Sequence, residues 1–180
     1  MEIKQVGFQG LLTIQPSVYH DSRGYFFESY NKENLKQFGV DVDFVQDNQS
    51  LSAKNVLRGM HYQNPPYAQG KLLSVIKGAV LDVVIDLRKK SPYYGKYFSI
   101  VLSEENKTMF WVPPGFAHGF LSLAENTIFV YKCTQVYNKA SEGSILWNDP
   151  EININWGVKN PIVSEKDLNA PFFKDVHSLF

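Results

Sequence analysis

The chain has 180 residues, a length typical of one domain, and we expect residues 1–180 to form a single domain. Hydrophobic residues make up 44% of the chain and charged residues 20%, which excludes a disordered chain, a collagen-like repeat and a coiled coil. The 18 basic residues balance the 18 acidic ones, so the chain lacks the overall positive charge on which nonspecific nucleic-acid binding relies.

Strand-like runs follow one another along the chain, with few helical segments between them. Aromatic residues, which favour strands, make up 14% of the sequence. In chain order the patterns predict a strand over 25–30, a helix over 31–38 that stops at Gly39, strands over 71–76, 79–87, 97–102, 108–112, 120–123 and 127–137, and a short helix opening at 164–167. Many short strands in one domain predict a β-sandwich or β-barrel, in which inward-facing side chains converge on one cavity.

Two pairs of these strands are predicted to form hairpins. Lys77-Gly78 lies between the runs 71–76 and 79–87, and Ala124-Glu125-Asn126 lies between 120–123 and 127–137. In the run 79–87 the side chains alternate, so that one face carries Ala79, Leu81, Val83, Ile85 and Leu87 and the other carries Val80, Asp82, Val84 and Asp86.

The sequence also predicts where the protein is found. Residues 1–5 lack the basic and apolar segments of a signal peptide, and no apolar run approaches the roughly 20 residues of a transmembrane helix. The single cysteine, Cys133, cannot form an intrachain disulfide. We expect a cytoplasmic protein that binds neither a membrane nor nucleic acid.

Standard catalytic motifs are absent: the chain has no Gly-x-Gly-x-x-Gly, no Walker loop, no Gly-x-Ser-x-Gly and no His-Glu-x-x-His. Two of its four histidines, His61 and His118, lie in distinctive surroundings. The stretch Pro113 to His118 resembles the second motif of cupins, jelly-roll barrels that often bind a metal through three histidines and a glutamate. Two histidines without a third or a nearby carboxylate are a poor transition-metal set, so we expect no metal.

A set of motifs, in order over nearly the whole chain, resembles the dTDP-4-dehydrorhamnose 3,5-epimerase family. These motifs are Asp21 to Glu28, Gln46 to Ser50, Leu57 to Gln63, Gln69 to Leu72, Asp82 to Arg88, Ser91-Pro92, Pro114 to Phe120, Tyr131 to Thr134 with Tyr137, Trp147 to Pro150, and Ser164 to Asp167. No single motif is specific, but their order is. The resemblance implies a mainly β, cupin-type jelly-roll barrel with a few short helices, acting without metal or other cofactor on a nucleotide sugar.

The resemblance also implies catalytic roles. The family epimerises a dTDP-linked 4-keto-6-deoxy sugar, whose ketone at C4 acidifies the protons on C3 and C5. By position, His61 matches the base, Asp167 the residue that orients it, and Tyr131 the acid on the opposite face. Lys71 and His118 match the groups that stabilise the enolate oxygen. Ser164 and Asp167 also fit a helix-capping pair, and Tyr131 and Tyr137 also fit core packing.

Other positions match the family's nucleotide contacts. Arg58 and Arg23 are the candidates for the phosphates, and Phe26 for stacking on thymine. Further polar contacts are implied for Glu28, Gln46, Asn48, Glu142 and Lys166, and a regular strand after Tyr131 would place Tyr137 near the same pocket. In the family the arm that carries Arg23 and Phe26 crosses to a partner subunit, which implies a homodimer with an exchanged N-terminal arm.

The function predicted in this way is conversion of dTDP-4-dehydro-6-deoxy-D-glucose to dTDP-4-dehydro-L-rhamnose, which serves polysaccharide synthesis. Three alternatives stay open. One is an epimerase that acts at C3 or C5 only, or on another nucleotide-linked 4-keto sugar. The second is a metal-dependent cupin oxygenase, and the third is a non-catalytic sugar-binding module, which would explain the aromatic residues but not the catalytic set.

Overall fold

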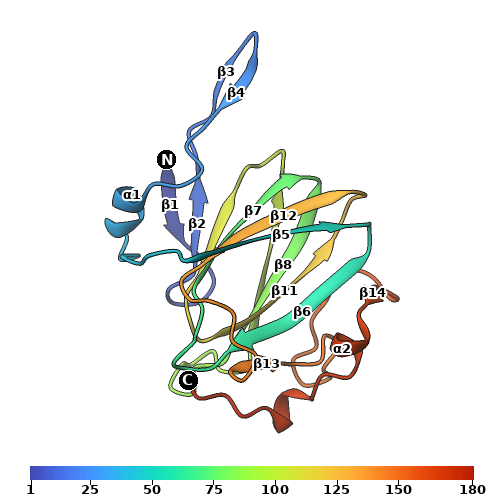
Figure 1. Cartoon of the computed structure of the whole chain (residues 1–180). Coiled ribbons are helices and arrows are strands. Elements are labelled where there is room, and N and C mark those ends of the chain that lie inside the picture. Colours follow the sequence, from blue (N-terminus) through green and yellow to red (C-terminus); the bar gives the residue numbers. More distant parts are fainter.

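A computed structural model describes residues 1–180 and shows two six-stranded sheets that face each other, with a small hairpin projecting from one end (Figure 1). The first sheet has the order β1-β2-β10-β7-β12-β5, with bounds Glu2–Gln5, Leu12–Gln15, Met109–Val112, Lys71–Lys77, Thr127–Cys133 and Gln46–Ser52. The second has the order β13-β6-β11-β8-β9, with β14 also paired to β6; their bounds are Glu142–Ser144, Val56–Gln63, Phe116–Ser122, Ala79–Asp86, Tyr97–Ser103 and Ile162–Val163. This arrangement confirms the mainly β, jelly-roll prediction.

The core between the two sheets is built largely from large apolar side chains. Leu73, Phe110 and Phe129 come from the first sheet, and Val84 and Phe120 come from the second. Removing these side chains from water is the main driving force for closing the sheets on each other. The same alternation that fills the core also directs a few polar side chains of these strands into the interior.

Two further apolar clusters cover the outer faces of the sheets. The segment after residue 144 lies on the second sheet and contributes Ile145, Trp156 and Phe173 to one cluster. The helix α1, Lys32–Lys36, contributes Leu35 to the other, on the first sheet. Strand β8 is therefore buried on both faces, with Val84 facing the core and the neighbouring Val83 facing outward. This confirms the alternation predicted for 79–87 and explains why apolar residues occupy both faces of that run.

The two predicted hairpins are wrong. Strands β7 and β8 lie in different sheets, as do β11 and β12. The turn signals mark where the chain changes direction, but they do not choose the partner strand. At Gly78 the backbone has φ +79°, and a Cβ would lie 2.5 Å from Thr127 Oγ1. The connection between β7 and β8 therefore packs against the start of β12, where the chain has crossed from β11 to the other sheet. Each strand instead pairs within its own sheet, β8 with β9 and β11, and β12 with β5 and β7.

The remaining elements agree in part with the predictions. Helix α1 begins after Asn31, whose side chain accepts a hydrogen bond from the Asn34 N–H, and helix α2, Glu165–Leu168, begins after Ser164 in the same way. The strand predicted over 25–30 is only β4, Gly24–Phe26, paired with β3, Tyr19–Asp21, and the strand predicted over 127–137 ends at Cys133. A 3₁₀ turn covers Phe173–Asp175. No helix has the length and apolar character needed to cross a membrane.

Candidate active site

An irregularity in β6 brings two of the predicted site residues to the same face. Regular alternation would direct Arg58 and His61, three residues apart, to opposite faces. However, His118 and Phe120 are two positions apart on β11, whereas their partners on β6, His61 and Arg58, are three positions apart. Strand β6 therefore carries one extra residue at this point, which is a β-bulge. Gly59 and Gly119 allow the two strands to approach there, since a Cβ on Gly59 would lie 2.5 Å from Gly119 Cα.

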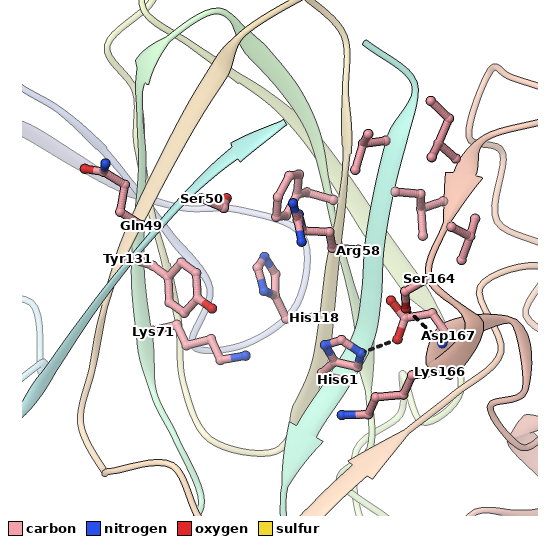
Figure 2. Close-up of a pocket in the computed structure, with 15 residues that line it drawn as sticks. Gln49, Ser50, Arg58, His61, Lys71, His118, Tyr131, Ser164, Lys166 and Asp167 are labelled. Atoms are coloured by element: carbon pink, nitrogen blue, oxygen red, sulfur yellow. Dashed lines mark hydrogen bonds and ion pairs between the residues drawn. The ribbon is translucent and has the colours of Figure 1, made fainter. Parts of the chain in front are cut away.

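A cavity of about 540 Å³ opens beside this bulge, and the five residues predicted to be catalytic line it from five different elements (Figure 2). These residues are His61 on β6, Lys71 on β7, His118 on β11, Tyr131 on β12 and Asp167 on α2. His61 and Tyr131 lie on opposite sides of the cavity, with Lys71 and His118 between them (Figure 2). Arg58, Lys166, Gln49 and Ser50 line it as well.

His61 is held by a buried carboxylate. Asp167 Oδ1 lies 2.6 Å from His61 Nε2, and its Oδ2 accepts a hydrogen bond of 3.3 Å from the Gly59 N–H. Burial opposes ionisation of Asp167, but these hydrogen bonds outweigh it and lower the pKa of the carboxyl. An ionised Asp167 accepts a hydrogen bond from Nε2–H, which leaves the other ring nitrogen, Nδ1, free of that contact, and Nδ1 points to the side where Lys71 lies (Figure 2).

Asp167 makes both the contact of a helix cap and the contact with His61. Ser164 Oγ accepts a hydrogen bond of 3.2 Å from the backbone N–H of Asp167, which begins helix α2. The carboxylate of Asp167 remains available for His61. The cap therefore fixes the backbone of the residue whose side chain reaches the cavity.

Burial sets the proton affinity of the other three groups. It raises the pKa of the Tyr131 phenol, which therefore stays protonated at neutral pH, and it lowers the pKa of the Lys71 ammonium. Lys71 Nζ lies 5.8 Å from the centre of the Tyr131 ring. Burial also lowers the pKa of His118, whose Nε2 lies 2.8 Å from Asp82 Oδ2. The cavity thus holds two imidazoles, a phenol and an amine within one enclosure.

A second hollow, of about 400 Å³, adjoins the cavity through the residues they share, His61, Lys71 and Tyr131. Its lining includes four of the predicted nucleotide contacts: Gln46, Asn48, Tyr137 and Glu142. Tyr137 reaches it although β12 ends at Cys133, because its backbone N–H donates to Gln46 Oε1 (2.8 Å) and its hydroxyl donates to Glu142 Oε2 (3.1 Å). Lys166 Nζ forms an ion pair with Glu142 Oε1 (2.6 Å) at the junction of the two hollows.

Three predicted residues lie outside both hollows. Phe26 is 70% exposed on the β3–β4 hairpin, and Arg23, on the same hairpin, forms an ion pair with Asp21. Glu28 accepts a hydrogen bond of 3.2 Å from the Asn34 side chain. The chain therefore does not bring its own arm to its own cavity.

Sequence reasoning missed Asp82. This carboxylate is fully buried on the core-facing side of β8 and contacts His118. The signal was present, since alternation placed Asp82 on one face with Val80 and Val84. Its partner lies 36 residues away, and only the pairing of β8 with β11 brings the two together. Gln49 and Ser50, which also line the cavity, were missed as well.

The fold and these side chains define a β-barrel protein equipped for acid–base chemistry. No group of three or more His, Cys, Asp or Glu side chains comes together that could hold a metal ion.

Comparison with known proteins identifies the family. The family model described as dTDP-4-dehydrorhamnose 3,5-epimerase matches residues 5–175. The enzyme of that name from Shigella flexneri is 48% identical over 176 residues, with 97% of each chain covered. The crystal structure of the Elizabethkingia anophelis enzyme superposes with a TM-score of 0.93 at 47% identity, covering 97% of each chain.

A third comparison includes a ligand. The Legionella pneumophila epimerase in complex with dTDP-4-keto-L-rhamnose superposes with a TM-score of 0.93 at 42% identity, covering 98% of this chain and 94% of the other. The chain belongs to the dTDP-4-dehydrorhamnose 3,5-epimerase family.

The Asp167 contact predicts a pH-dependent contribution to stability. Because the pKa of folded Asp167 lies below its unfolded value of about 3.9, the ionised carboxylate stabilises the folded state above that pH, and the stabilisation is lost as the pH falls through the folded pKa. We expect Asp167→Asn to lower the free energy of unfolding by about 1.5–3 kcal/mol at neutral pH. The difference from the wild type should shrink below about pH 4.

Denaturant unfolding across this pH range measures the effect. The control is Asp47→Asn, which removes an exposed ion pair with Lys132 and should cost less than about 1 kcal/mol. A difference between wild type and Asp167→Asn that stays constant, or grows, as the pH falls below 4 would contradict the ionised state assigned to Asp167.

Proposed function

We propose that the protein inverts C3 and C5 of dTDP-4-dehydro-6-deoxy-D-glucose to give dTDP-4-dehydro-L-rhamnose, a step of dTDP-L-rhamnose biosynthesis. The observation that carries the proposal is the placement of His61 and Tyr131 on opposite sides of one cavity. Inversion of a carbon next to a ketone requires removal of a proton from one face and delivery to the other. The names of the relatives support the choice of nucleotide and sugar.

The proposed reaction uses four side chains. His61 Nδ1 removes the proton from C3 or C5, the C–H electron pair forms a double bond to C4, and the carbonyl π electrons move onto the oxygen. The ammonium of Lys71 and the ring of His118 stabilise that enolate oxygen. Such preorganised groups in a water-poor site are typically worth a few kcal/mol to the transition state. Tyr131 O–H then protonates the carbon from the opposite face, and solvent exchange restores both residues.

The adjoining hollow is the place we propose for the nucleotide. Gln46, Asn48, Tyr137 and Glu142 line this hollow. Arg58, at the edge of the main cavity, donates to Ser52 Oγ (3.2 Å) and to the Leu51 carbonyl (3.4 Å), so its guanidinium is held in place for a phosphate.

The exposed arm supports a second proposal, that two copies exchange their β3–β4 hairpins. Tyr19, Tyr25 and Phe26 are all more than half exposed on this arm, and large exposed apolar patches mark interaction sites. The arm projects away from the barrel (Figure 1). In a homodimer of this kind, each one-domain subunit of residues 1–180 would supply Arg23 and Phe26 to the nucleotide hollow of the other. The cytoplasmic location stays a prediction.

Incubation of the protein with the proposed substrate in heavy water tests the reaction. We expect solvent deuterium at both C3 and C5 of the product, detected by mass spectrometry and NMR. His61→Ala should lower the exchange rate by about 100-fold or more, because it removes the base. His177→Ala, which changes an exposed histidine outside the site, is the control and should leave the rate unchanged.

The heavy-water result also separates the alternatives. Deuterium at one carbon only would identify a mono-epimerase, and no exchange at either carbon would exclude the proposed chemistry. Full activity in His61→Ala would show that another group is the base.

Mixing two defective variants tests the exchanged arm. Arg23→Ala lacks a phosphate contact and His61→Ala lacks the base, so we expect each to be impaired alone. In a mixed dimer with exchanged arms, one of the two sites receives both an intact His61 and an intact Arg23, and activity should partly return after the variants are mixed and refolded together. If each arm serves its own subunit, no mixed dimer has an intact site and no activity will return.

A further inference from the structure

Asp82 is a buried carboxylate for which the reaction described above gives no role. It is fully buried on β8, between Val80 and Val84, which both belong to the core between the sheets. Its Oδ2 contacts His118 Nε2 at 2.8 Å, and its Oδ1 has no hydrogen-bond partner. Burial of a carboxylate with one oxygen unsatisfied is costly, so the position calls for an explanation.

The contact leaves one nitrogen of His118 available. His118 lines the cavity, and its Nε2 is occupied by Asp82. Its Nδ1 makes no hydrogen bond within the protein and is not among the fully enclosed polar atoms that lack a partner, which are Ser50 Oγ and Asp82 Oδ1. The accessible part of this imidazole therefore includes Nδ1, on the side of the cavity.

The number of protons on the pair decides what Nδ1 can do. With one proton, an ionised Asp82 accepts from Nε2–H, and Nδ1 is a bare acceptor. With two protons, Nδ1 carries a hydrogen, whether the second proton resides on Asp82 or on the imidazole. An enolate oxygen accepts hydrogen bonds, so only the two-proton pair can stabilise it.

We propose that Asp82 and His118 together hold two protons, one between Oδ2 and Nε2 and one on Nδ1, so that Asp82 positions His118 as a hydrogen-bond donor to the cavity. This proposal rests on the proposed function for its purpose, the binding of the enolate oxygen, but the proton count belongs to the protein alone. Asp82 touches no substrate and is a positioning residue.

The surroundings of the pair both favour and oppose protonation of the Asp82 carboxyl and of the His118 ring. Burial raises the pKa of the Asp82 carboxyl and lowers the pKa of His118, which together favour a protonated carboxyl that donates to Nε2. The charge of Lys71 favours an ionised Asp82, and His61 on β6 disfavours a charged His118. Tyr131 on β12 faces the same ring at 6.5 Å and stays neutral. A neutral pair avoids placing a negative charge where the enolate forms.

Nitrogen NMR of the full-length protein, labelled with ¹⁵N-histidine, tests the proton count without substrate. The His118 signals are assigned by their loss in His118→Gln. We expect a protonated Nδ1 at neutral pH. At higher pH the pair loses the bridging proton, and the remaining hydrogen should move from Nδ1 to Nε2. An unprotonated Nδ1 with a protonated Nε2 at neutral pH would overturn the proposal.

Two variants of Asp82 test the consequence. The side-chain amide of Asp82→Asn can donate to Nε2 as a protonated carboxyl does, so Nδ1 should stay protonated. Asp82→Leu cannot donate to Nε2. We expect Asp82→Asn to keep kcat within about 10-fold of the wild type, and Asp82→Leu to lower kcat by about 100-fold, the usual effect of losing one donor from an oxyanion site.

Asp86→Asn is the matched control. Asp86 is a second fully buried carboxylate on β8, but it binds Arg88 and Ser91 away from the cavity. This variant should change neither the His118 signals nor kcat. Equal loss of kcat in Asp82→Asn and Asp82→Leu would show that an ionised carboxylate is required and would overturn the proposal. If Asp82→Leu does not fold, the NMR result and Asp82→Asn decide.

The outcome is separable from that of the proposed function. A protonated Nδ1 without deuterium exchange would support the proposal for the Asp82–His118 pair and contradict the proposed function. Deuterium exchange at both carbons with an unprotonated Nδ1 would support the proposed function and contradict the role given to Asp82.

Discussion

The contact between Asp167 and His61 joins the two parts of the structure on which the site depends. Asp167 belongs to the C-terminal segment, which covers the outer face of the second sheet through Trp156 and Phe173. His61 belongs to a strand of that sheet and faces the interior. Their 2.6 Å contact links the covering segment to the cavity and leaves one imidazole nitrogen without a partner in the protein. The outer cluster therefore anchors the segment from which Asp167 reaches His61.

Environment gives similar side chains different proton affinities in this barrel. Asp167 accepts hydrogen bonds from the Gly59 backbone and from His61, which lower its pKa, whereas Asp82 has fewer partners and complete burial, which raises its pKa. The two histidines differ with their carboxylates: the contact with Asp167 leaves Nδ1 of His61 free to act as the proposed base, and the contact with Asp82 is proposed to make His118 present a hydrogen. A phenol kept protonated by burial completes the set. Separation of proton affinities in this way is what acid–base catalysis at neutral pH requires.

Much of the fold was predictable from local pattern, and the limits have physical causes. The alternation of 79–87 correctly separated core-facing Val84 from outward-facing Val83. The spacing of Leu35 and Phe38 before Gly39 marked one helix, and the capping residue Ser164 marked another. Strand pairing was not predictable, because a short turn such as Gly78 serves equally well for a hairpin and for a crossing between sheets. Of the short β3–β4 hairpin only β4 was predicted, as part of the run 25–30, since the residues of the hairpin are exposed and show no core-facing pattern.

The site was predictable to a different degree. The family resemblance supplied His61, Lys71, His118, Tyr131 and Asp167, and the structure brings all five to one cavity. Spacing alone could not have done this, because the bulge at Gly59 reverses the face that His61 would occupy in a regular strand. The contact of Asp82 with His118 depends on the pairing of β8 with β11, which no local pattern reveals. Arg23 and Phe26 lie apart from the cavity, and their place in a second subunit remains a proposal.

In the proposed reaction, a base and an acid act from opposite faces of one sugar ring. The most direct measurement is to follow the substrate in heavy water with Tyr131→Phe, which removes the acid and keeps the base. The account predicts that deuterium enters the recovered substrate at C3 or C5 without a change of configuration, while the epimerised product forms far more slowly than with the wild type. Epimerised product formed at the wild-type rate, or a complete loss of exchange in a folded variant, would contradict it.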